Sequence, residues 1–137
     1  YHDTIDAELT RLQEAGIDPV LIAMHSFTPV LNGEGRTWEM GILWDKDRAT
    51  AEIFINELRE AGYLVGDNEP YSGKAPQDYT IDTHAEGANL SHVGIEIRQD
   101  LIHHADGVER IAEVMQPLLA SLPARVQPTD INSRRSV

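Results

Sequence analysis

Two hydrophobic spacings alternate along this chain, and together they predict alternating helices and strands. Apolar residues three and four positions apart form one stripe over residues 3–15 and another over 45–61, which is the spacing of an amphipathic helix. Gly16 and Gly62 follow these two segments, at the position where a helix commonly ends. We therefore expect two helices, each with one face against a core.

A third helix is expected toward the C-terminus, with Asp106 capping its start. Val108, Ile111 and Met115 recur after it at helical spacing and are expected to face inward. Pro117 has no amide hydrogen and is expected to end or kink this helix.

Shorter apolar runs predict strands between the helices. These runs cover residues 19–24, 39–44, 63–65 and 92–98. The first is continuously apolar, which is typical of a strand buried on both faces. A long irregular stretch over 66–90 precedes the last strand, with a helical turn near 80–86. This alternation predicts a single α/β domain over 1–137, with helices packed on a mostly parallel or mixed central sheet.

Composition narrows the functional classes. The chain has 137 residues and a net charge of −12, from 11 basic and 23 acidic residues. Such a surface repels phosphate backbones, so we expect no nucleic-acid partner. No apolar run approaches the roughly 20 residues that cross a bilayer. The chain has no cysteine, which excludes disulfides. We expect a cytoplasmic protein without membrane contact.

His25 stands directly after the first predicted strand. In open α/β sheets, ligands bind beyond the carboxyl ends of the strands, so this position favours a functional imidazole. A structural histidine at a strand end is the alternative, and position alone does not separate the two.

Glu96 lies inside the last predicted strand, where successive side chains point to opposite faces. One face holds Val93, Ile95 and Ile97, and the other holds Gly94, Glu96 and Arg98. A carboxylate at such a position is costly unless it is paired or used. Glu96 either forms an ion pair with Arg98 on a solvated face or acts as a general base at the floor of a cleft.

Several loop residues are further candidates. Asn68 and Tyr71 belong to a polar, turn-rich segment over 66–73, and such loops carry many binding groups. Arg36 lies on a glycine-flanked loop, where its guanidinium could hold a substrate carboxylate with two hydrogen bonds. His84 lies in the long irregular stretch and is a candidate cleft residue. An ordinary surface loop is the alternative for these positions.

Three blocks of sequence follow one another in a specific order. They are Met24-His25-Ser26-Phe27-Thr28-Pro29, then Gly66-Asp67-Asn68-Glu69-Pro70-Tyr71-Ser72-Gly73, then Ile95-Glu96-Ile97-Arg98-Gln99-Asp100-Leu101-Ile102. In this order they resemble the N-formylglutamate amidohydrolase family, which looks related to the zinc carboxypeptidases. The resemblance covers most of the chain and implies a hydrolase-like α/β fold similar to that of the zinc carboxypeptidases.

The resemblance also implies an activity and its residues. It implies hydrolysis of an N-acyl amide bond, with N-formyl-L-glutamate giving formate and L-glutamate. It implies that His25 is a ligand of Zn2+ and that Glu96 deprotonates a zinc-bound water, roles that suit an imidazole and a carboxylate. Four further side chains are our candidates for holding substrate carboxylates or the developing oxyanion: Arg36, Asn68, Tyr71 and Arg98.

One feature departs from the resemblance. Such zinc sites need three protein ligands, and the related enzymes take two of them from a segment ahead of the His25 strand. This chain has no matching pair there, so we expect it to be the C-terminal portion of a longer catalytic domain. The alternatives are a related deacylase or carboxypeptidase-like hydrolase, and a catalytically inactive binding module without the full metal site.

Overall fold

The computed structural model describes residues 1–74, 80–86 and 88–126, apart from the side chain of Asp82. Its elements, in chain order, are α1 (His2–Glu14), β1 (Val20–Phe27), β2 (Val30–Leu31), β3 (Glu34–Gly35), β4 (Met40–Leu43), α2 (Arg48–Glu60), β5 (Val65–Asp67), the π-helical turn η1 (Ile81–Glu86), β6 (Ser91–Arg98), the 3-10 helix η2 (Gln99–Ile102) and α3 (Ala105–Arg125). All three predicted helices and all four predicted strands have counterparts among them.

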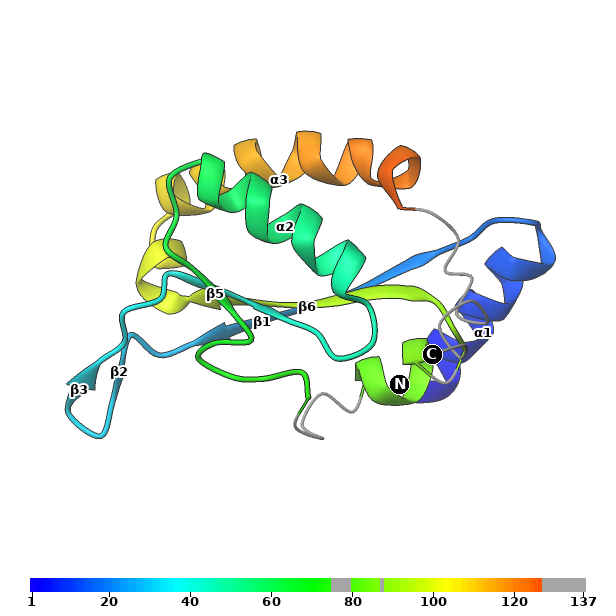
Figure 1. The fold of residues 1–137 in the computed structure, drawn as a ribbon, viewed down its shortest axis with the longest axis horizontal. Coiled ribbons are helices and arrows are strands. Elements are labelled where there is room, and N and C mark those ends of the chain that lie inside the picture. The colour runs from blue at the N-terminus through cyan, green and yellow to red at the C-terminus, as the bar shows by residue number, and fades with distance from the viewer. Residues whose placement is uncertain (75–79, 87, 127–137) are drawn as a thin grey trace, which may run out of the picture.

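Four strands form one mixed sheet in the order β1-β6-β4-β5. Two of its pairs, β1 with β6 and β4 with β5, are parallel, whereas β4 and β6 are antiparallel. Helices α2 and α3 cover one face of this sheet, and α1 and η1 lie on the other side (Figure 1). The predicted class, helices on a mostly parallel or mixed sheet, is therefore confirmed.

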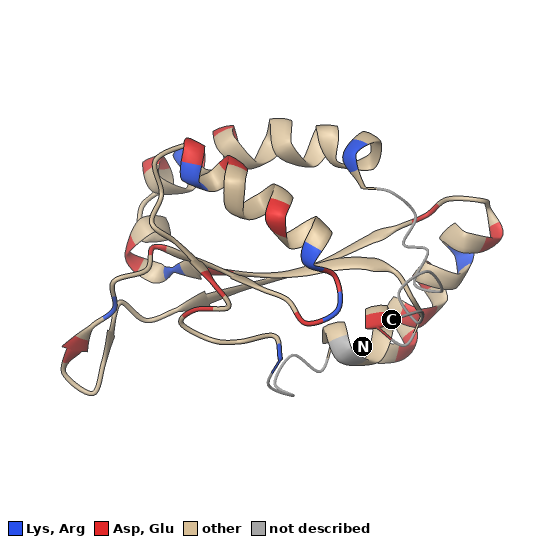
Figure 2. Cartoon of the chain, viewed as in Figure 1, with Lys and Arg blue, Asp and Glu red and all other residues tan. Residues whose placement is uncertain are grey.

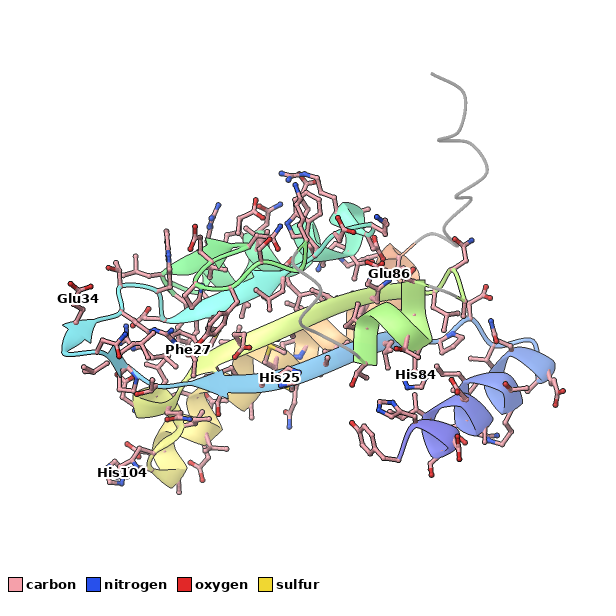
Figure 3. All side chains as sticks on the ribbon, turned by 90° about the horizontal axis from the view of Figure 1, so that it is seen from below. His25, Phe27, Glu34, His84, Glu86 and His104 are labelled. Carbon is pink, nitrogen blue, oxygen red and sulfur yellow. The ribbon has the colours of Figure 1, made fainter. Side chains whose placement is uncertain are left out.

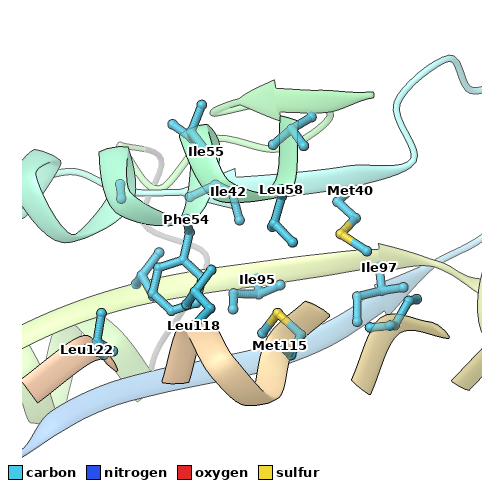
Figure 4. Packing of buried hydrophobic residues seen from close by; sticks show 14 residues of the cluster. Met40, Ile42, Phe54, Ile55, Leu58, Ile95, Ile97, Met115, Leu118 and Leu122 are labelled. Carbon is cyan, nitrogen blue, oxygen red and sulfur yellow. The ribbon is translucent and has the colours of Figure 1, made fainter. Parts of the chain in front are cut away.

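The main core lies between β6 and the two covering helices. Ile95 of β6 and Phe54 of α2 are fully buried there, and Met115 of α3 closes the cluster from the side of the second helix (Figure 4). Burying such side chains contributes roughly 1.5–3 kcal/mol each. The apolar face of β6 is thus committed to the core, so its alternate residues must face the other side of the sheet.

The start of α2 is tied to the central strand by a buried carboxylate. Asp47 caps the helix by accepting a hydrogen bond from the Thr50 amide at 3.0 Å. Its second oxygen accepts one from the His92 amide of β6, also at 3.0 Å. Asp47 therefore both caps α2 and fixes its start on the sheet.

Helix α3 differs from its prediction in three ways. His104 rather than Asp106 is its N-cap, and the helix continues through Pro117 to Arg125. Val108 is 49% exposed instead of facing inward. The physical reason is the helix phase. The buried stripe runs through Gly107, Ile111, Met115, Leu118 and Leu122, and so passes beside Val108.

Strand β1 also corrects its prediction. It extends to Phe27, so His25 lies within the strand rather than after it. It pairs only with β6 and is an edge of the described sheet, which explains why it is not buried on both faces. Met24, for example, is 53% exposed.

Candidate active site

His25 and Glu96 are neighbours across the pair β1–β6. The two strands are parallel, and His25 and Glu96 are direct partners in their register. Partners in a parallel pair point to the same face of a sheet, here the face opposite α2 and α3. The imidazole is exposed at the sheet edge, whereas the carboxylate is half-buried. Two positions far apart in the sequence thus meet on one surface.

A pocket of about 270 Å³ opens at this pair. It is lined by His25, Ser26, Leu43, Tyr71, Ser72, Gly73 and Glu96. Its floor comes from β1, β4 and β6, and one wall comes from the segment after β5. The residues that the sequence singled out separately, an imidazole, a carboxylate and a tyrosine, therefore share one concave site.

Two glycines in the sheet allow the 68–73 loop to form that wall. Gly41 of β4 and Gly66 of β5 are register partners, and Gly41 is also the partner of Glu96. The backbone of Glu69 passes directly over both glycines, and a Cβ on Gly66 would lie only 2.7 Å from the Glu69 Cβ. The hydrophobic pattern does not mark either glycine, although glycine inside a strand signals a close backbone approach.

Asn68 holds the same loop to the end of β4. Its Oδ1 accepts hydrogen bonds from the Trp44 amide at 2.9 Å and from the Gly73 amide at 3.0 Å. Its backbone φ is +55°, a conformation that asparagine tolerates better than most residues. The side-chain amide oxygen of Asn68 thus shapes the pocket wall, but Asn68 does not line the pocket itself.

Arg36 reaches the pocket wall from the segment after the β2–β3 hairpin. Its Nη1 donates a hydrogen bond to the Tyr71 hydroxyl at 2.8 Å. Its guanidinium carbon lies 5.3 Å from the centre of the Phe27 ring and 5.0 Å from that of the Tyr71 ring. This arrangement of a cation against two aromatic faces is attractive. Phe27 is a residue that the sequence did not mark.

Arg98 supports the segment that carries Arg36. Its Nη1 lies 3.0–3.3 Å from the backbone carbonyls of residues 36, 37 and 38 and donates hydrogen bonds to them. Its Nε donates to Asp100 at 2.7 Å. This hydrogen bond holds the pKa of Asp100 below its usual value of 3.8, and it raises the pKa of Arg98. The ion pair of Arg98 is therefore with Asp100.

His84 lies outside this pocket. It is buried on η1, where its Nε2 is 2.7 Å from His2 Nδ1 and its Nδ1 is 2.5 Å from an Asp6 carboxylate oxygen. Figure 3 shows His84 beside α1 and away from His25, which lies farther along β1. The candidate cleft residue thus joins η1 to α1 and does not line the pocket.

The family model for N-formylglutamate amidohydrolases matches residues 1–103. The chain belongs to the N-formylglutamate amidohydrolase family. No protein of curated function matches it.

Two solved structures share the fold of this family member. A gene product of Agrobacterium tumefaciens is 33% identical, with a TM-score of 0.83 over 90% of this chain and 49% of its own. The N-formylglutamate amidohydrolase of Ralstonia eutropha JMP134 is 23% identical, with a TM-score of 0.52 over 96% of this chain and 52% of its own. This family member therefore spans about half the length of either structure.

The described residues of this family member do not make a zinc site on their own. No group of three or more His, Asp or Glu side chains within 1–74, 80–86 and 88–126 is placed to hold a metal ion. His25 is an exposed imidazole at the pocket and is suited to be one ligand.

In the same described part of the chain, no helix is long and apolar enough to cross a membrane.

The charges around the pocket differ from those of the whole surface. Acidic residues are spread along all three helices (Figure 2). At the pocket wall, in contrast, the half-buried Arg36 places a positive charge beside Tyr71. One side of the pocket therefore offers a carboxylate and an imidazole, and the other offers a phenol that accepts a hydrogen bond from the Arg36 guanidinium. This combination suits a small ligand that carries both a reactive carbonyl and a negative charge.

Proposed function

We propose that this protein hydrolyses the amide bond of an N-acyl amino acid, with N-formyl-L-glutamate as the substrate. The family supports an amidohydrolase broadly. The observation that carries the proposal is the register pairing of His25 with Glu96 in a pocket that also contains Tyr71. A base, a metal-ligating imidazole and a hydrogen-bond donor are the groups that amide hydrolysis needs.

Glu96 is the proposed general base. Its half-buried carboxylate faces the pocket, where it can accept a proton from a water that attacks the formyl carbon. The same carboxylic acid then returns the proton to the departing nitrogen. The C–O bond to the attacking water forms first, and the C–N bond then breaks. The second water proton passes to the amine as the formic acid ionises, so one water and one N-formyl-L-glutamate give formate and L-glutamate.

His25 is the proposed zinc ligand of this chain. Its imidazole is exposed at the sheet edge beside Glu96, and a neutral imidazole nitrogen is a good ligand for zinc. When bound, zinc supplies Lewis acidity that polarises a substrate carbonyl. The described residues hold no group of three such ligands, and the proposal assigns the remaining ligands to residues outside them.

The four proposed substrate-binding residues divide by their contacts. Tyr71 lines the pocket and accepts a hydrogen bond from Arg36, which supports the proposal that these two residues together stabilise a substrate carboxylate or the developing oxyanion. Asn68 and Arg98 contribute mainly by holding the 68–73 loop and residues 36–38 in place. Glutamate has two carboxylates, which suits a pocket whose lining residue Tyr71 is hydrogen-bonded to an arginine.

A catalytically inactive binding module is the second candidate function, and it is consistent with the lack of a three-ligand group among the described residues. Formate release separates it from an enzyme. Natural full-length protein, loaded with zinc, should release formate from N-formyl-L-glutamate and much less acid from N-acetyl-L-glutamate. A preference for another acyl group would indicate a related deacylase. No turnover of any N-acyl amino acid would contradict the proposed function.

A further inference from the structure

The contact between Arg36 and Tyr71 fixes the direction of a hydrogen bond. Arginine carries only donors, so the Tyr71 oxygen must accept from Arg36 Nη1 across the 2.8 Å contact. The single proton of the phenol therefore cannot be used in this contact. It remains for an acceptor on another side of the hydroxyl, and Tyr71 lines the pocket that contains His25 and Glu96.

Arg36 itself is held in place from three directions. The rings of Phe27 and Tyr71 lie against its guanidinium, and the two rings meet edge to face with centroids 6.4 Å apart. Its backbone amide donates to the Pro29 carbonyl at 2.8 Å, and its carbonyl accepts from Arg98 at 3.0 Å. Little side-chain freedom is left to lose when a ligand binds.

The charge of Arg36 is directed at the Tyr71 ring and hydroxyl. Within the described part of the chain, Arg36 forms no ion pair with a carboxylate, whereas Arg11, Arg48, Arg98, Arg110 and Arg125 each do. A cation that donates to a phenol oxygen makes the phenol proton a stronger donor, because hydrogen bonds in a chain polarise one another.

We propose that Arg36 is a positioning residue that acts through Tyr71, and that Tyr71 donates the hydrogen bond to an anionic oxygen of the ligand. This inference rests on the proposed function and assigns a separate role to each of these residues. Arg36 orients and polarises the phenol, Phe27 supports the guanidinium, and only Tyr71 touches the ligand. The anionic oxygen belongs either to a substrate carboxylate or to the oxyanion that develops at the formyl carbon.

A double-mutant cycle tests the coupling. Tyr71→Phe and Arg36→Met are made singly and together in the natural full-length protein. Binding of L-glutamate is measured by calorimetry, and hydrolysis of N-formyl-L-glutamate by formate release. We expect each single variant to lose about 10-fold to 100-fold in glutamate affinity or in turnover, the range for a hydrogen bond to a charged group. The double variant should lose no more than Tyr71→Phe alone.

The readout that changes identifies the oxygen. If Tyr71 meets a substrate carboxylate, L-glutamate binding weakens and KM rises while kcat is kept. If it meets the oxyanion, kcat falls while KM and L-glutamate binding are kept. If the wild type binds L-glutamate but releases no formate, weaker L-glutamate binding by Tyr71→Phe and Arg36→Met would support this inference, while the absent turnover would contradict the proposed function. A wild type that neither binds nor hydrolyses would contradict both.

Conservative variants separate positioning from packing. Arg36→Lys keeps a cation and a donor and should recover most of the binding or turnover that Arg36→Met loses. Arg36→Gln keeps a donor without the charge and should recover part of it. Arg48 also lies over an aromatic ring, that of Trp44 at 4.9 Å, but outside the pocket. Arg48→Met should therefore leave binding and turnover unchanged. Additive losses in the double variant, or no recovery by Arg36→Lys in a folded protein, would overturn the proposal.

Discussion

At the scale of single residues, the site depends on the different surroundings of two side chains. His25 is exposed at the edge strand, where its imidazole can meet an incoming ligand, whereas Glu96 is half-buried on the central strand. Partial burial of a carboxylate excludes competing water and strengthens its interactions with a bound substrate. The edge strand thus leaves the imidazole exposed to an incoming ligand, and the central strand keeps the carboxylate partly shielded from solvent.

The metal role of His25 is a prediction at this scale. His25→Ala should weaken zinc binding by at least about 100-fold, because even outer contacts of a zinc ligand are worth 10-fold to 100-fold. Metal analysis of the natural full-length protein after dialysis measures this. His104→Ala is the matched control, since this exposed histidine lies on a different part of the molecule (Figure 3). Equal zinc in wild type and His25→Ala would make His25 structural.

The ion pair of Arg98 with Asp100 predicts a pH dependence of stability. The folded-state pKa of Asp100 is lowered by its hydrogen bond with Arg98. Its contribution is therefore present above the unfolded-state pKa and is lost as pH falls through the folded-state value. The Asp100 side chain is 46% exposed, so solvent screening limits the ion pair's contribution to stability to about 0.5 kcal/mol.

Urea unfolding of Asp100→Asn measures this contribution. The variant should be less stable than wild type at pH 7, and the gap should close as pH is lowered through the depressed pKa. Asp106→Asn is the control, because its pair with Arg110 is 3.4 Å long and mostly exposed, and it should change stability little at either pH. A gap that widens at low pH would mean that Asp100 acts in another way.

The sequence alone predicted part of this residue-scale picture. Side-chain alternation in the last strand placed Glu96 opposite the core. The predicted strand end marked His25, although β1 in fact continues past it to Phe27. The sequence could not rank the four candidate binding residues, because all four have side chains that can bind a substrate and only their contacts distinguish them. These residues are Arg36, Asn68, Tyr71 and Arg98. The structure commits Asn68 and Arg98 to backbone groups, and it leaves Tyr71 at the pocket.

At the scale of elements, periodicity was informative where one face is buried. Helix α2 and strand β6 were predicted closely because both pack on the main core. Strand β5 covers Val65–Asp67 rather than 63–65, since it continues as far as its pairing with β4 extends. The β2–β3 hairpin was not predicted, although Asn32-Gly33 between its strands is a strong turn signal.

The glycines beneath the 68–73 loop give an element-scale prediction. Gly66→Ala should destabilise the protein by about 1–3 kcal/mol, because the new methyl group would displace the backbone of Glu69 from the sheet. It should also weaken glutamate binding, since Tyr71 and Gly73 move with the loop. Gly35→Ala is the matched control: no atom lies within 4 Å of its added Cβ. Thermal unfolding compares the two, and equal stability would contradict the close packing.

At the scale of the whole molecule, the sheet brings the site together from distant parts of the sequence. Alternating helices and strands predicted the α/β class, but not the strand order. That order, with β6 between β1 and β4, is what places His25, Glu96 and Gly41 side by side. Strand order depends on long-range pairing, which local periodicity does not contain.

The chain also spans only about half the length of the two solved structures. Its described residues contain the pocket, the proposed base and one proposed metal ligand, without a group of three ligands. In the proposed activity, this chain supplies the base, one metal ligand and one wall of the site.

Turnover by Glu96→Gln tests the central claim most directly. Natural full-length protein and this variant are loaded with zinc, their metal content is equalised, and formate release from N-formyl-L-glutamate is measured. The account predicts that the variant folds and keeps its zinc but loses about 10²-fold to 10⁴-fold in kcat, because only the proton acceptor has been removed. Turnover equal to that of the wild type would contradict it.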